Sequence, residues 1–434
     1  MATVASNMEC EGLTKLESTQ MMMGPAITTT TFIRGPIEEG RKVLKGRLLL
    51  VLQANPWLCG TLIKKGCCGK VVQLNYPASV KEGDVEVEKC FLDDGNKGGA
   101  SVSSNMDYVS VCKGVANTKS EVPPGSKSVK SKCSQCVLSV LPDSQNPDTF
   151  VVVLSISHVI IDGFNYYQIL GMLSDANKEI LSLSCKRKHT IEEEASNAIG
   201  KAEYKWMTGG GVICNVVCGM LCGSKPTIAC FAVDEKKVQG EKDAAASQAR
   251  GGFVSTNDVI VSSFGSINSS DWLFMPLNFR NKLPAYNDND AGNYEGSLLF
   301  GKGEYDSPAD IRNCLKSGPP KYTRGANISG QADGKVPLPG CWGSTRAKMA
   351  MAVSWVFNSF SEYQIPNCEQ LIHFPHTDCS LIPFDLCVTF KPRAGKTAVA
   401  LFSRSTDEKG LVEGCPVGAK VASAASYHAG SNAA

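Results

Sequence analysis

The sequence lacks an apolar run long enough to cross a membrane. Its longest apolar stretch near that length, Val212–Cys222, contains an Asn and a Gly and falls well short of the ~20 residues that a membrane helix needs. The N-terminus, MATVASNMECEG, has neither a basic segment nor an apolar core, so it does not resemble a secretory signal. We therefore expect a soluble, cytoplasmic protein without a membrane span.

An excess of one charge is also missing. The chain has 44 Lys and Arg against 42 Asp and Glu, a formal net charge of +2. No basic stripe interleaved with aromatic residues is present, so we expect no nucleic-acid partner. With 43% hydrophobic and 20% charged residues, the composition is typical of a globular protein.

The length of 434 residues exceeds what one compact core organises, which predicts two domains. The three glycines at 209–211 indicate a hinge, and we place the boundary between about 185 and 228. This division gives an N-terminal domain of 1–205 and a C-terminal domain of 206–434. We expect a monomer.

Cysteine is abundant: the chain has 19, and without a secretory signal we interpret them as reduced, small buried side chains. Cys133 and Cys136 form a single C-x-x-C. This is half a ligand set, so we expect no metal, with a zinc site as the alternative. Cys214, Cys218 and Cys222 follow each other at steps of four. Helix packing explains them, and a thiol cluster is the alternative.

Apolar and β-branched runs alternate with helical stripes along the chain, which predicts an α/β (α+β) fold. The expected strands are 28–33, a short strand around 58–62, 136–141, 149–157, 228–233, 272–279, 386–390 and 397–402, the last two as a hairpin. Expected helices are 37–52, 164–173 and two that begin at capping patterns at Ser255 and Ser307. Stretches 84–105, 117–132 and 318–346 are predicted as loops because Gly, Ser, Lys and Pro dominate them.

One motif carries chemistry: SISHVIIDGF, in which His158 follows a strand that is apolar at nearly every position. A strand covered on both faces would hold His158 rigidly. A neutral imidazole, with a pKa near ~6.5, can take a proton at physiological pH. Asp162 can lie past the turn, where a buried cation would hold it, and Gly163 permits a tight turn or a close approach. The alternative is a structural histidine at a strand end.

The stretch SISHVIIDGFNYYQIL resembles the acyltransferase superfamily defined by its H-x-x-x-D-G motif. That superfamily includes the plant and fungal BAHD acyltransferases, chloramphenicol acetyltransferase, wax ester synthases and peptide condensation domains. Five weaker similarities occur in family order. NPWLCGTL lies upstream of the motif, and STNDVIVSSF, PLNFRNKLP, AGNY at 291–294 and VSW at 353–355 lie downstream. The resemblance implies two chloramphenicol-acetyltransferase-like domains, each a mixed sheet with flanking helices, and an active-site channel between them.

The chain departs from the BAHD pattern at one place. The D-F-G-W-G signature expected after the Ser-Trp strand is absent, and the chain has HFPHTDCSLIPFDLCVTF there. That element is structural in the family, so its loss leaves the base in place. We therefore expect a divergent member that lacks the DFGWG motif. His373 and His376 lie in this stretch, and the Phe-Pro between them predicts a loop, so we give them no role.

The resemblance implies a role for each matched residue. His158 would be the general base, and Asp162 and Arg280 would form a structural ion pair behind it; an exposed loop charge is the alternative for Arg280. Ser354 or Trp355 would donate to the oxyanion, with ordinary strand packing as the alternative.

Three further residues, Ser255, Thr256 and Asn257, would lie near the acyl-CoA, although a helix cap alone would also explain them. No cofactor is implied beyond acyl-CoA as co-substrate. The implied activity is acyl transfer from acyl-CoA to a small-molecule alcohol or amine. The alternatives are a condensation-type enzyme that uses carrier-protein thioesters and a non-catalytic family member that serves as a binding or scaffold protein.

Overall fold

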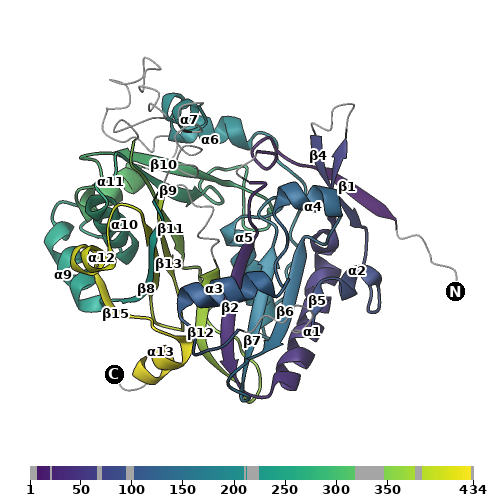
Figure 1. Ribbon diagram of the computed structural model, residues 1–434. Coiled ribbons are helices and arrows are strands. Elements are labelled where there is room, and N and C mark those ends of the chain that lie inside the picture. Colours follow the sequence, from purple (N-terminus) through teal and green to yellow (C-terminus); the bar gives the residue numbers. More distant parts are fainter. Residues whose placement is uncertain are drawn as a thin grey trace.

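The computed structural model describes residues 7–19, 22–65, 71–93, 102–209, 212, 224–317, 347–376 and 384–431. The expected loop at 318–346 and the Cys214–Cys222 helix face lie outside these residues. Two large sheets dominate the described part (Figure 1).

The first sheet has the strand order β12-β2-β7-β6-β5. Its strands are β2 (Ile27–Arg34), β5 (Phe91–Leu92), β6 (Cys136–Pro142), β7 (Thr149–Ile156) and β12 (Glu369–His376). All pairs are antiparallel except β5 with β6. Every residue of β7 is buried, as predicted from its continuous apolar run, because α1 (Ile37–Ala54) and α5 (Gly163–Ser174) pack on one face of the sheet.

The second sheet has the strand order β10-β9-β11-β13-β14-β8-β15. Its strands are β8 (Thr227–Val233), β9 (Trp272–Asn278), β10 (Glu295–Gly301), β11 (Met349–Trp355), β13 (Asp385–Phe390), β14 (Ala398–Ser403) and β15 (Val417–Lys420). β11 runs parallel to β9 and β13, so the sheet is mixed. Its outer face packs on α10 (Thr256–Ile267), seen with α9, α11 and α12 at the left of Figure 1.

The inner faces of the two sheets share one hydrophobic core. Val151 and Val153 of β7 pack in the same cluster as Val388 and Phe390 of β13. Helix α3 (Tyr108–Asn117) contributes Tyr108 to this cluster. The two sheets therefore form the middle layers, with α1 and α5 outside one and α10 outside the other.

The remaining elements lie around these layers. A small sheet has the order β1-β4-β3, formed by β1 (Met8–Gly12), β4 (Val71–Pro77) and β3 (Thr61–Lys65). The other helices are η1 (Pro56–Cys59), α2 (Val85–Glu88), α4 (Gly125–Ser131), α6 (Ile191–Ile199), α7 (Lys201–Met207), α9 (Glu235–Ala246), α11 (Pro308–Ser317), α12 (Glu408–Gly414) and α13 (Ala424–Ser431).

Most of the secondary structure expected from the sequence is confirmed, including the hairpin of β13 and β14. Three expectations are wrong in part. Residues 84–105, expected as a loop, contain α2 and β5, and residues 117–132 contain α4. The short strand expected around 58–62 begins as a 3-10 turn before β3. The boundary at 205 stays a prediction, but β12 from the C-terminal half pairs along β2 in the N-terminal sheet. One segment of the C-terminal half therefore completes the sheet of the other half.

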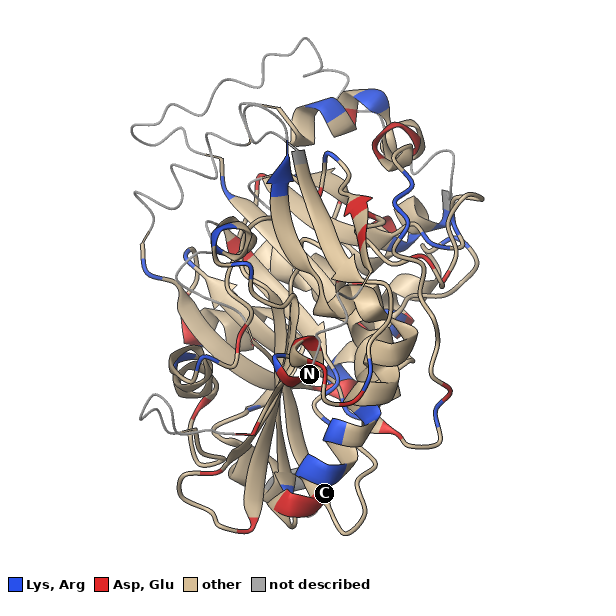
Figure 2. Ribbon diagram, turned by 90° about the vertical axis from the view of Figure 1, so that its right-hand side faces the viewer, with Lys and Arg blue, Asp and Glu red and all other residues tan. Residues whose placement is uncertain are grey.

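Among the described helices, none combines the length and the apolar character that a membrane crossing requires. Both signs of charge lie on the outer helices and loops, and the interior strands carry few charged residues (Figure 2).

Candidate active site

Strand β7 ends at Ile156, and His158 follows two residues later in a turn. The imidazole is half-buried. Its Nδ1 is buried without a hydrogen-bond partner among the described residues, so the accessible edge of the ring lies on the Nε2 side. The backbone carbonyl of His158 accepts a hydrogen bond of 2.9 Å from Asn293 Nδ2. A fixed backbone and an accessible imidazole edge are what proton transfer requires.

Asp162 is the N-cap of α5, and its Oδ1 accepts a hydrogen bond of 3.1 Å from the Asn165 amide. Its Oδ2 accepts from the Tyr294 amide at 3.1 Å and from Arg280 Nη1 at 2.6 Å. Asp162 is 1% exposed and Arg280 2% exposed, so this is a buried ion pair. It joins the first turn of α5 to the β9–β10 connection.

Arg280 donates through all three guanidinium nitrogens. Besides Asp162, its acceptors are the Asp290 carbonyl at 2.9 Å, Asn278 Oδ1 at 3.1 Å, Asn165 Oδ1 at 2.7 Å and the Gly292 carbonyl at 2.9 Å. The guanidinium also lies over the rings of Phe164 and Tyr294, 5.0 Å and 5.1 Å from their centroids. The alternative of an exposed loop charge for Arg280 is therefore wrong.

A second buried ion pair supports the same turn, and no local sequence pattern predicts it. Arg187 Nε donates to Glu17 Oε2 at 2.9 Å, and both side chains are 0% exposed. Arg187 also donates to the carbonyls of Ile160 at 2.9 Å and Ala291 at 2.8 Å. Glu17 Oε1 accepts from the Asn293 amide at 3.1 Å. The pair thus holds the His158 turn and the 291–293 segment together.

Gly163 and Trp355 approach each other across the two halves. An added Cβ on Gly163 would lie 3.7 Å from Trp355 Nε1 and 3.7 Å from Phe357 Cζ. These are ordinary contact distances, and the φ angle of Gly163 is not positive, so the steric reason predicted for this glycine is wrong. Glycine instead leaves space between the turn and the indole N–H.

Among the described residues, no hydrogen bond joins the imidazole to Ser354 or to the three residues at the start of α10. Side chains alternate along β11, so Ser354 lies on the face of Ala350 and Ala352, which pack with α10, opposite Trp355. Ser255 caps α10 in a reciprocal capping box, and Thr256 and Asn257 form the first turn. The cap accounts for these three positions, and a role beside acyl-CoA stays a prediction.

The loop predicted around His373 and His376 is wrong, because both lie in β12. β12 is an edge strand, where a proline is tolerated, and Pro375 stands opposite Thr29. His373 is fully buried, with Nδ1 2.8 Å from Thr31 Oγ1 and Nε2 3.2 Å from the Tyr167 hydroxyl. Burial lowers the pKa of His373 to about 3. It is a neutral core residue.

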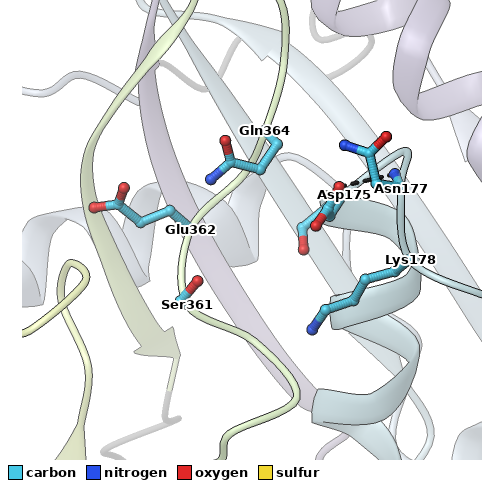
Figure 3. Close-up of a pocket in the computed structure, with 7 residues that line it drawn as sticks. Asp175, Asn177, Lys178, Ser361, Glu362 and Gln364 are labelled. Atoms are coloured by element: carbon cyan, nitrogen blue, oxygen red, sulfur yellow. Dashed lines mark hydrogen bonds between the residues drawn. The ribbon is translucent and has the colours of Figure 1, made fainter.

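A small polar hollow of about 160 Å³ lies beside the C-terminal end of α5 (Figure 3). Its lining residues are Ser174, Asp175, Asn177, Lys178, Ser361, Glu362 and Gln364. Substrate sites usually measure ~300–1,000 Å³. The hollow is smaller than that and lies at the opposite end of α5 from Asp162, so it is not part of the His158 site.

Sequence comparison gives no relative: no protein-family description and no curated protein matches this chain. Comparison with solved structures does give relatives in fold, and they belong to one class of two-domain acyltransferases and condensation domains. The fold class expected from the sequence is therefore confirmed.

The individual structures cover nearly the whole chain. TRI101 of F. graminearum, complexed with coenzyme A and T-2 mycotoxin, aligns at a TM-score of 0.60 and 13% identity over 93% of this chain and 96% of that one. Vinorine synthase aligns at 0.55 and 12% over 96% and 93%. The first condensation domain of the CDA synthetase aligns at 0.55 and 11% over 93% of each chain. At these identities the likeness establishes the fold alone.

Proposed function

We propose that this protein transfers an acyl group from an acyl-CoA thioester to a small-molecule alcohol or amine, with His158 as the general base. The observation that carries the proposal is the half-buried imidazole at the end of a fully buried strand, in a turn held by two buried ion pairs. The fold supports it, since TRI101, which is similar in fold, has been crystallised with coenzyme A together with the small molecule T-2 mycotoxin.

In this mechanism the acceptor hydroxyl or amine lies against Nε2 of His158 and the thioester carbonyl lies beyond it. The imidazole takes the acceptor proton as the oxygen or nitrogen attacks the carbonyl carbon, giving a tetrahedral oxyanion. The intermediate collapses with cleavage of the carbon–sulfur bond, and the imidazolium returns its proton to the CoA thiolate. The enzyme forms no acyl intermediate, and general-base assistance contributes about 10²–10⁴-fold to the rate.

The oxyanion requires a hydrogen-bond donor. Trp355 is the better of the two residues expected in this role, because its indole Nε1 faces the space beside Gly163, whereas Ser354 lies on the other face of β11. Asp162 and Arg280 act behind the base, where their mutual hydrogen bonds fix the start of α5. Binding of both substrates at one imidazole supplies the proximity contribution.

The test offers the protein a panel of acyl-CoAs with pooled alcohols and amines and measures free CoA by chromatography. A thiol dye would also react with accessible cysteines of the chain, such as the exposed Cys10, and is avoided. His158→Ala is expected to lower CoA release at least about 100-fold with an unchanged circular dichroism spectrum. His189→Ala is the matched control, since His189 is exposed, and it should keep full activity. Unchanged release by His158→Ala rejects the assigned base.

A carrier-protein thioester is the second candidate donor, favoured by the structural likeness to a condensation domain. The same assay separates the two donors. Turnover with free acyl-CoA alone supports the first proposal, and turnover only with acylated carrier protein supports the second.

A further inference from the structure

Glu295, the first residue of β10, lies close to the His158 site. The two residues before it contact the motif: Asn293 Nδ2 donates to the His158 carbonyl at 2.9 Å, and the Tyr294 amide donates to Asp162 Oδ2 at 3.1 Å. Side chains alternate along an extended strand, so Glu295 shares a face with Asn293 and not with Tyr294. Its cross-strand partner on β9 is Asn278, which accepts from Arg280.

This face of the second sheet is the one turned toward the N-terminal half. Leu299, four residues along β10, packs with Phe274 and Met349 on the side away from α10. Trp355 of β11, the second strand from β10, packs against the cluster shared by the two sheets. Glu295, Gly296 and Ser297 are only half-buried, whereas the next three residues of β10 are buried. The start of this strand therefore borders accessible space on the side of His158.

Asp162 and Glu295 differ in whether their carboxylates have partners. Asp162 is neutralised by Arg280, and neither is in contact with solvent. Glu295 forms no hydrogen bond or ion pair through its carboxylate with the described part of the chain. Burial and the Asp162 charge raise the pKa of Glu295 to about 7, while His158 and Arg280 act in the opposite direction. Glu295 is therefore the acidic group of this site whose carboxylate has no partner among the described residues, and with a pKa of about 7 it ionises fully only when a cation binds beside it.

We propose that Glu295 is a specificity residue whose carboxylate binds the ammonium group of a cationic acceptor, so that the acceptor is an amino alcohol or a polyamine. The inference rests on the proposed acyl transfer. The ammonium group donates hydrogen bonds to the carboxylate, and the hydroxyl or second amine of the same molecule lies at His158 Nε2. A charged hydrogen bond of this kind in a partly desolvated site favours the cation over a neutral molecule of equal shape by at least about tenfold.

The experiment compares two acceptors of equal shape and different charge. Dimethylaminopropanol is cationic and has only its hydroxyl to acylate, and isohexanol is its neutral counterpart. We expect wild-type kcat/KM to be at least about tenfold higher for the cationic alcohol. Glu295→Gln should bring the ratio to within about twofold of one, mainly through KM for the amino alcohol. Glu193→Gln, at an exposed glutamate of α6, is the control and should keep the wild-type ratio.

Several results would overturn the assignment. A wild-type ratio near one, or a ratio that Glu295→Gln leaves unchanged, removes the recognition role. An equal loss with both alcohols means that Glu295 acts through His158 and not on the acceptor.

A binding measurement tests the recognition role of Glu295 independently of the proposed acyl transfer. If neither alcohol is acylated from any acyl-CoA, acyl transfer to these acceptors has failed. Calorimetric titration of dimethylaminopropanol into wild type and Glu295→Gln then decides the recognition role alone. A Kd at least about tenfold weaker in the variant supports it, and equal Kd values refute it.

Discussion

Replacing Glu17 by Gln leaves the Arg187 guanidinium buried without its counter-charge. Arg187 makes hydrogen bonds to Glu17 and to the carbonyls of Cys185, Ala291 and Ile160. The neutral Gln keeps the size of the side chain but loses one of the two acceptor oxygens. Removal of one member of a buried pair costs about 3–5 kcal/mol, because the remaining charge keeps its desolvation penalty. We expect Glu17→Gln and Arg187→Met each to lose stability in that range.

The double variant, Glu17→Gln with Arg187→Met, should cost less than the two single variants together. No uncompensated charge remains in it, so the coupling free energy should be at least about 2 kcal/mol. The matched control is the exposed pair Lys420–Glu408, 2.7 Å apart with side chains 48% and 45% exposed. Substitutions there should each cost less than about 1 kcal/mol.

The assay has a stability arm and an activity arm. Urea unfolding followed by tryptophan emission gives the free energies of unfolding. CoA release, measured where the variants are folded, gives kcat and KM. Arg187 anchors the carbonyl of Ile160, two residues from His158, so Arg187→Met should lower kcat with little change in KM. Single-variant costs no larger than those of the Lys420–Glu408 control, or additive costs in the double variant, would refute the reasoning.

Two further predictions follow from the other buried groups. Arg280→Lys keeps the charge but loses the planar fork that serves Asp162 and Asn165 at once. Because buried acceptors of Arg280 then lose their donors, we expect a loss of at least about 2 kcal/mol in urea unfolding and a lower kcat, and a wild-type midpoint would contradict this. The pKa of His373 is lowered to about 3, so its stabilising contribution is full above pH ~6.5 and declines as the pH falls toward 3. At pH 5 the decline amounts to about 2 kcal/mol; the stability difference between wild type and His373→Asn should shrink by that amount between pH 8 and pH 5, and a constant difference would contradict the assignment.

The sequence allowed prediction of those parts of the fold that depend on local patterns. The apolar run of β7 and the capping box at Ser255 are local signals, and both elements are present. Helix α4 could not be predicted from the local sequence, because tertiary packing determines it. Gly125 stands so close to Val159 and Met23 that an added Cβ would lie 2.5 Å from the Val159 side chain, and no local pattern in GSKSVKS reports that packing.

Some residues of the candidate site could be predicted from the sequence motif or the resemblance, and others are brought together only by the fold. His158 and Asp162 belong to one motif, and the resemblance led to Arg280, which pairs with Asp162 across 118 positions. Glu17 and Arg187 are 170 positions apart, and nothing in either neighbourhood marks them as partners. Glu295 was overlooked because a single glutamate in a strand has no pattern. Its environment is created only by the meeting of two distant segments.

The insertion of β12 beside β2 has a consequence for how the protein is made. The ribosome completes β12 about 220 residues after β7, which is roughly 10–45 s at a synthesis rate of ~5–20 residues per second. During that interval the open hydrogen-bonding edge of Ile27–Arg34 can pair with any extended strand nearby. A nascent chain therefore exposes this edge until β12 is made, and we expect a fragment ending at residue 205 to keep the edge open and to aggregate more readily than the full chain.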